Sequence, residues 1–175
     1  MKTSRTTLAV IVAVVVTALT IPSLQAAPSK SSAGAFSSPP RDLAQYGHIR
    51  SLVRKGSRYE LRLDPAFWLG GSTANRAALE DKVIGPGETV PNDYYIRDES
   101  RQVLTYRVPT TARATVLVQG AGGIRSQRVG IADLAQIVRG RNPQGRRIYD
   151  RGNHLGYWAR IQLDTVRALD QQYQP

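Results

Sequence analysis

The segment YGHIRSLVRKGSRYELRL, residues 46–63, decides the fold of this 175-residue chain. Its second half, RYELRL, alternates strictly between charged and apolar side chains, as a strand does when one face is buried and the other is wet. Lys55-Gly56-Ser57 interrupts the pattern, and a short connection that contains glycine is typical of a β-hairpin. The sequence therefore predicts that residues 46–53 and 58–63 form the two strands of a hairpin.

Outward from this hairpin, short segments between turn residues predict further strands, and two segments with helix-favouring composition or spacing predict short helices. The predicted strands are 94–97, 103–108, 114–119, 124–129, 157–163 and 166–169, and the predicted helices are 72–80 and 131–138. This content indicates a mainly β (α+β) domain, a small and strongly bent β-barrel with two short helices. The order of elements is similar to that of a five-stranded oligonucleotide/oligosaccharide-binding (OB) barrel with an insertion.

The alternation of the strands also predicts which side chains are buried, because successive residues of a strand face opposite sides of the sheet. Three arginines are expected on the outside, namely Arg58, Arg62 and Arg107. The residues expected largely inside are Tyr59, Leu61, Leu63, Ile96, Leu104, Tyr106, Val116, Val118, Ile161 and Leu163.

The first 27 residues have the pattern of a secretory signal. Lys2 and Arg5 precede an uncharged apolar run over residues 8–19, and small residues follow, with cleavage expected near Ala26 or Ala27. The alternative is an uncut anchor, although the run is shorter than the roughly 20 apolar residues of a spanning helix. Residues 28–40 are rich in Ser, Pro and Ala and are expected to form a flexible leader, which leaves 41–175 as a single β-rich domain without a transmembrane span.

The charge of the chain points to anionic partners. Removal of the signal takes away Lys2 and Arg5 and lowers the formal charge from +11 to +9. For an exported chain, such a charge favours anionic wall polymers, lipid head groups or extracellular nucleic acid. The absence of cysteine excludes disulfides, thiolate metal sites and a cysteine nucleophile. No segment has the spacing of a metal or cofactor site, so neither is expected.

Two segments are candidates for ligand binding. Residues 92–98 combine aromatic and charged side chains, and Tyr94, Tyr95 and Arg97 are the candidates for stacking a sugar or a base. The structural alternative is that one tyrosine packs inward while Asn92-Asp93 forms a turn.

The second segment is an open loop with five arginines, which suits salt-sensitive contacts with phosphates. The predicted polyanion-binding residues are Arg139, Arg141, Arg146, Arg147 and Arg151. The alternative is a solvated loop without a specific role. The first hairpin offers another location for the polyanion, through Arg50, Arg54, Arg58 and Arg62.

Four segments together carry a family resemblance: residues 46–69, VPNDYYIRDES (90–100), TYRV (105–108) and DQQYQP (170–175). They resemble an uncharacterised family of secreted or lipid-anchored proteins of actinobacteria and related Gram-positive bacteria. The resemblance covers about residues 46–175 and implies no assigned activity. Many of these proteins carry a lipid-modified cysteine, which this chain lacks.

No catalytic constellation stands out in the sequence. The glycines at 120–123 lack the lysine and the following helix of a phosphate-binding loop, so they predict a hairpin turn. The sequence thus favours an exported, non-enzymatic module that associates with an anionic surface polymer. The alternatives are an extracytoplasmic hydrolase that uses His48 or His154 with a carboxylate, and a protein-interaction or inhibitor module that binds another secreted protein.

Overall fold

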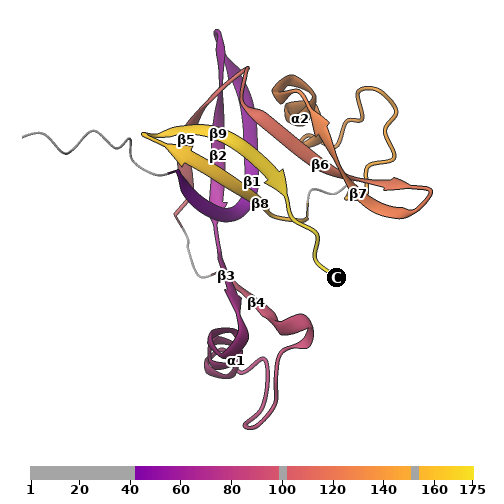
Figure 1. Cartoon of the computed structure of the whole chain (residues 1–175). Helices are drawn as coiled ribbons and strands as arrows, with labels where there is room; N and C mark the ends of the chain where they lie inside the picture. Colours follow the sequence, from indigo (N-terminus) through magenta and orange to yellow (C-terminus); the bar gives the residue numbers. More distant parts are fainter. Residues whose placement is uncertain (1–41, 99–101, 151–153) are drawn as a thin grey trace, which may run out of the picture. The chain divides into compact units, whose positions relative to one another are not determined.

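The computed structural model describes residues 42–98, 102–150 and 154–175 (Figure 1). The predicted signal and leader, residues 1–40, lie outside this part. The elements in chain order are β1 (Leu43–Lys55), β2 (Arg58–Pro65), β3 (Phe67–Gly70), α1 (Gly71–Glu80), a 3-10 turn (Pro91–Asp93), β4 (Tyr94–Arg97), β5 (Leu104–Pro109), β6 (Arg113–Gly120), β7 (Gly123–Val129), α2 (Ile131–Ile137), β8 (Tyr157–Gln162) and β9 (Thr165–Gln171). None of the described helices is both long and apolar enough to cross a membrane.

Five of the strands close into a barrel, which confirms the predicted fold class. β1 pairs antiparallel with β2 and with β8, β2 pairs with β5, and β8 pairs with β9. A parallel contact between Arg107 of β5 and Thr165 of β9 closes the circle. The five barrel strands in chain order are β1, β2, β5, β8 and β9. The first of them, β1, lies between β2 and β8, and the third, β5, runs parallel to the fifth, β9. These are the pairings of an OB barrel.

The strand β1 bends so that it can belong to both sides of the barrel. Residues 43–47 pair with β8, whereas residues 47–55 pair with β2. A bulge between Ile49 and Ser51 leaves Arg50 without a cross-strand partner, and its guanidinium instead forms an ion pair with the buried Asp64. A β-bulge increases the local bend and twist of a strand, as barrel closure requires.

The barrel core contains most of the residues predicted for it. Tyr59, Leu61, Leu63, Val116, Val118 and Ile161 are buried, while Ile96, Leu104 and Tyr106 are half-buried. The three predicted outer arginines, Arg58, Arg62 and Arg107, are exposed. The helix α2 covers part of this core with Ile131, Leu134 and Ile137, which belong to the same apolar cluster as the barrel residues.

The prediction for Leu163 is wrong, since 79% of this side chain is exposed. The hairpin between β8 and β9 turns at Leu163 and Asp164, both with positive φ (46° and 62°), so β8 ends at Gln162. Two successive residues with positive φ are typical of the tight turns that match the twist of a hairpin. The expected turn at 164–165 was therefore displaced by one residue, which placed Leu163 in a strand.

The hairpin β6–β7 extends the sheet beyond the barrel. β6 lies parallel to β9, and β7 pairs with β6 from Val129 to Gly123, where Gly120 and Gly123 face each other across the turn. This confirms the turn that was predicted from the glycines at 120–123. Figure 1 shows α2 beside this hairpin, next to β6.

Residues 67–97 form an insertion between the second and third barrel strands. Its two-stranded sheet, β3–β4, packs with α1 around a small apolar cluster of Ala74, Ala78 and Val90. The sequence predicts α1 and β4 but no strand at β3. An aromatic cluster joins the insertion to the barrel: Trp68 of β3 lies 5.2 Å from Tyr46 and 6.4 Å from Trp158 between ring centroids.

One polar atom in the barrel core lacks a partner. The Tyr157 side chain is fully buried, and its hydroxyl makes no hydrogen bond within the described residues. Burial, followed by the charge of Asp150, raises the pKa of Tyr157 above the ordinary tyrosine value. The folded state therefore opposes ionisation of this phenol, and an unpaired buried hydroxyl costs stability.

Replacement of Tyr157 by phenylalanine is expected to raise the free energy of unfolding by about 1 kcal/mol, measured by urea unfolding at neutral pH. Because the folded-state pKa of Tyr157 is raised, the phenol ionises first in the unfolded chain, so the free energy of unfolding of the unaltered protein falls as the pH rises above about 10. Tyr157→Phe should consequently unfold less readily in alkali. Tyr46→Phe is the matched control, since Tyr46 accepts a 2.7 Å hydrogen bond from Gln174 and its loss should lower stability. Equal effects of the two variants would contradict this explanation.

Candidate functional site

The first predicted ligand site is engaged in contacts within the insertion. Tyr94 stacks on Trp68 with ring centroids 4.4 Å apart and an interplanar angle of 11°. On the other side of β4, the Tyr95 hydroxyl donates to Asp81 at 3.0 Å, and Arg97 donates to the same carboxylate at 2.6 and 2.9 Å. The hydrogen bonds from Arg97, together with that from Tyr95, hold the pKa of Asp81 below its usual value.

Arg97 makes two further bonds to α1, to the Ala77 carbonyl at 3.1 Å and to the Glu80 carboxylate at 3.0 Å. Tyr95 and Arg97 thus fasten the end of α1 to β4, and Tyr94 extends the aromatic cluster. Ligand binding by Tyr94, Tyr95 and Arg97 stays a prediction. A ligand that used Arg97 would compete with two carboxylates for the guanidinium.

The second predicted site, the arginine loop, divides into exposed and buried side chains. Arg139, Arg141 and Arg147 are exposed, whereas only 9% of the Arg146 side chain is accessible. Arg146 forms an ion pair with Asp133 of α2 at 2.8 Å. Arg151 lies outside the described residues. The role of these five arginines in polyanion binding stays a prediction, but Arg146 also has a structural role that the sequence did not indicate.

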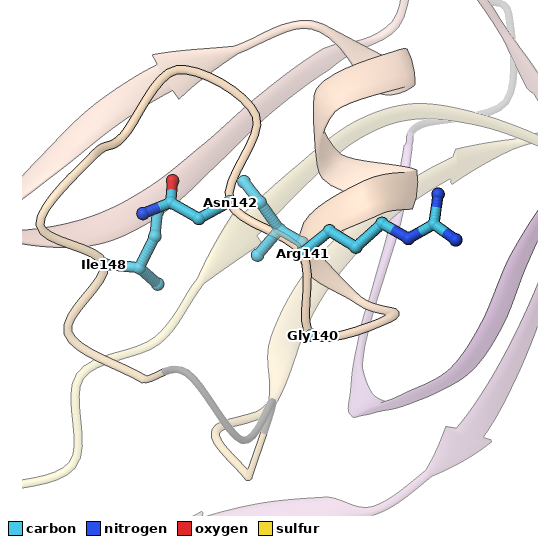
Figure 2. A pocket seen from close by; sticks show the side chains of 5 residues that line it. Gly140, Arg141, Asn142 and Ile148 are labelled. Atoms are coloured by element: carbon cyan, nitrogen blue, oxygen red, sulfur yellow. The ribbon is translucent and has the colours of Figure 1, made fainter.

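Hydrogen bonds and a β-bridge hold this loop in place, although its composition predicts an open loop. Asn142 accepts a hydrogen bond from the Arg146 backbone at 2.9 Å, and Ile148 forms a β-bridge with Val118 of β6. A cavity of about 170 Å³ lies under the loop, lined by Ile137, Gly140, Arg141, Asn142 and Ile148. In Figure 2 the Arg141 side chain extends past the end of α2, away from the Asn142 amide.

A different groove, of about 270 Å³, lies over β2 and β5 at the end of the barrel where two hairpin turns meet. The last residue of β1, Lys55, and the first residue of β2, Arg58, line it beside their turn, and the turn between β8 and β9 contributes Asp164. The remaining lining residues are Tyr59, Glu60, Thr105, Tyr106 and Arg107. In OB barrels, the second and third strands and these same two loops form the face that binds oligonucleotides and oligosaccharides.

The groove carries a net positive charge, because three cationic and two acidic side chains line it. Lys55, Arg58 and Arg107 line it, and Arg62 stands on the same outer face of β2 as Arg58. None of these four forms an ion pair with a carboxylate of the described residues, although Glu60 and Asp164 line the same groove. Burial, and secondarily the charge of Asp164, raises the pKa of Tyr106, so this tyrosine remains a neutral hydrogen-bonding group at physiological pH.

The two histidines do not form part of a catalytic arrangement in the residues described. His48 is half-buried on β1, where its ring lies 6.0 Å from that of Tyr46, and His154 is exposed. Neither makes a hydrogen bond to a serine or carboxylate of the described chain. The same residues contain no group of three His, Asp or Glu side chains that could hold a metal ion. The hydrolase alternative therefore gains no support from this geometry.

Comparisons with protein-family models, with curated proteins and with solved structures find no significant match to this chain.

Proposed function

We propose that this protein is an exported binding module and that the groove over β2 and β5 holds an anionic polymer of the cell surface. The observation that supports this most directly is the coincidence of Lys55, Arg58 and Arg107 in one groove on the barrel. Lys55 and Arg58 flank the turn between β1 and β2, and Arg107 comes from β5. None of the three forms an ion pair with a described carboxylate, and the groove keeps a net formal charge of +1 after Glu60 and Asp164, which also line it, are counted.

The position of the groove is a second, independent support. An OB barrel brings the ends of its second and third strands next to two hairpin turns, so a flexible polymer can contact strands and loops together. Without the predicted signal the chain has a formal charge of +9, which attracts polyanions from a distance and raises their rate of encounter. The groove then provides the place where contacts are made.

The triple variant Lys55→Gln, Arg58→Gln, Arg107→Gln tests the proposal. Each neutralised charge contributes roughly 0.7 to the slope of log affinity against log salt on a single-stranded polyanion, so three should flatten it by about 2. The affinity for a fluorescent single-stranded oligothymidylate at low salt should fall at least about tenfold. Poly(glycerol phosphate) serves as the second probe, because a wall polymer shares the phosphate charge but has no bases.

The matched comparison is the triple variant Arg139→Gln, Arg141→Gln, Arg147→Gln, which removes the same charge from the exposed part of the arginine loop. A larger change of slope in this second variant would move the binding site to the loop and overturn the groove assignment. Absence of salt-dependent binding to both probes by the unaltered protein would overturn the function itself. Thermal unfolding should be similar for all three proteins, because exposed charges contribute little to folding.

A protein-interaction role is the second candidate. It is favoured by apolar side chains that are exposed on the insertion, namely Phe67, Leu79 and Val83, with exposed fractions of 59%, 44% and 60%. Cross-linking on producing cells would distinguish the two roles. The insertion is supported as an interaction surface if the groove triple variant still captures a protein partner and Phe67→Ser does not.

A further inference from the structure

A second cavity, separate in its residues from the groove, lies beside α2. Its volume is about 490 Å³, and it is formed where the turn after β5, the end of β7 and the arginine loop meet. The polar residues that line it are Thr110, Thr111, Arg128, Asp133, Gln144 and Arg146. Two guanidinium groups, two hydroxyls and one carboxylate are therefore gathered in one place.

Arg146 is the unusual member of this group. Its side chain is nine-tenths buried, and its Nη2 donates to Asp133 at 2.8 Å and to the Gln144 amide oxygen at 2.5 Å. The Nε and Nη1 atoms are also buried but have no acceptor among the described residues. Buried N–H groups without acceptors are costly, most of all on a charged group. Arg146, which lines the cavity, thus keeps two donors that lack an acceptor among the described residues.

The charge balance of the cavity favours an anion as that acceptor. Asp133 offsets the charge of Arg146, while Arg128 is exposed and has no ion pair with a described carboxylate. One positive charge therefore remains, accompanied by the hydroxyls of Thr110 and Thr111. Guanidinium groups bind phosphate oxygens through charge-assisted hydrogen bonds, which are stronger than those between neutral groups.

Gln144 already accepts one of the hydrogen bonds that Arg146 could donate to such an anion. Its amide nitrogen donates to Asp133 at 2.9 Å, and its oxygen accepts from Arg146, while the residue itself is exposed. An exposed amide is exchanged for a ligand more readily than a buried one because water replaces its lost hydrogen bonds. An oxyanion that displaces Gln144 reaches the guanidinium of Arg146 and is close to the charge of Arg128.

From this arrangement we infer that the cavity beside α2 binds a single phosphate group through Arg146 and Arg128. The site goes beyond the proposed polymer groove and does not depend on it, since the two share no lining residue. A tetrahedral oxyanion supplies several acceptor oxygens at once, which suits donors that approach from a guanidinium, a second arginine and two threonine hydroxyls.

The test is a titration of the purified protein with inorganic phosphate, measured by isothermal titration calorimetry. The ionic strength is held constant, and chloride is the reference ion. Saturable binding is expected, and Arg128→Gln should weaken it at least about tenfold, the loss expected for a charge-assisted hydrogen bond. Arg146→Gln should abolish it. Since Arg146 is also structural, Thr111→Val provides a milder variant of the same site and should weaken binding several-fold.

Arg125→Gln is the matched control, because Arg125 is exposed on the same strand, carries the same charge and does not line the cavity. Equal weakening by Arg125→Gln and Arg128→Gln would overturn the site, as would loss of phosphate binding in the groove triple variant. A parallel titration with dimethyl phosphate identifies the source: binding as tight as that of inorganic phosphate supports a diester of a polymer backbone, and weaker binding supports a terminal or free phosphate. Failure of the groove experiment leaves each of these readouts unchanged.

Discussion

Replacement of Leu134 by alanine should lower the free energy of unfolding by about 3 kcal/mol, the usual cost of a large-to-small change at a fully buried site. Leu134 is completely buried in α2 and belongs to the apolar cluster of the barrel. Its loss removes apolar contacts and leaves a cavity between the helix and the strands. The change is measured by urea denaturation, with far-UV circular dichroism to confirm that the native sheet is retained.

The control for this variant is Leu163→Ala. Leu163 belongs to the turn between β8 and β9 and is mostly exposed, so its truncation should change stability by less than about 0.5 kcal/mol. The two substitutions are chemically identical, and only the burial of the leucine differs. Similar losses in the two variants would mean that α2 does not cover the barrel core.

Gly47→Ala should lower the free energy of unfolding by a comparable amount, about 3 kcal/mol or more, because it adds a methyl group where there is no space for one. A Cβ at this position would overlap the backbone carbonyl of Asp64, whose carbon would lie 3.0 Å away, as would the Cα of Pro65. Neither neighbour is a side chain that can rotate aside. The strands β1 and β2 would have to separate at the point where β1 passes from one partner to the other.

The matched control is Gly130→Ala, before α2. Gly130 has φ −72° and ψ 154°, a conformation open to any residue, and an added Cβ meets nothing within 4 Å. This variant should unfold within about 0.5 kcal/mol of the unaltered protein. If Gly47→Ala unfolded cooperatively with an unchanged free energy of unfolding, β1 and β2 would tolerate a wider spacing at Gly47 than the structure has.

The sequence predicts the barrel strands well because their alternation reports directly on one buried face. RYELRL and LTYRVP alternate polar with apolar side chains, and Arg58, Arg62 and Arg107 are exposed as this alternation predicts. The four-residue strand β3, FWLG, offers no such alternation, and only its pairing with β4 identifies it as a strand. Leu163 illustrates the remaining limit: the exact turn residues set the register, and a displacement of one residue changes the face of a side chain.

The candidate sites were less accessible to sequence reasoning because they depend on long-range pairing. Arg58 and Arg107 were each predicted on a wet face, yet their common groove exists only because β2 neighbours β5 and β5 meets β9. The burial of Arg146 follows from its pairing with Asp133 across a Gly- and Pro-containing loop, a contact without a periodic signal. Charge composition therefore indicated the kind of partner, while the topology was needed to indicate a place.

The aromatic cluster has a consequence for optical measurements on this protein. Trp68 and Trp158 are the two tryptophans of the chain, and they lie 6.4 Å apart at the junction of insertion and barrel. The tryptophan emission of the chain thus originates at one location, with Tyr46 at 5.2 Å from both rings. A change in tryptophan emission reports on the contact between β3 and the barrel. The sheet signal in circular dichroism reports instead on the strands themselves. Any detachment of the insertion that leaves the barrel intact would be visible as a divergence of these two spectra.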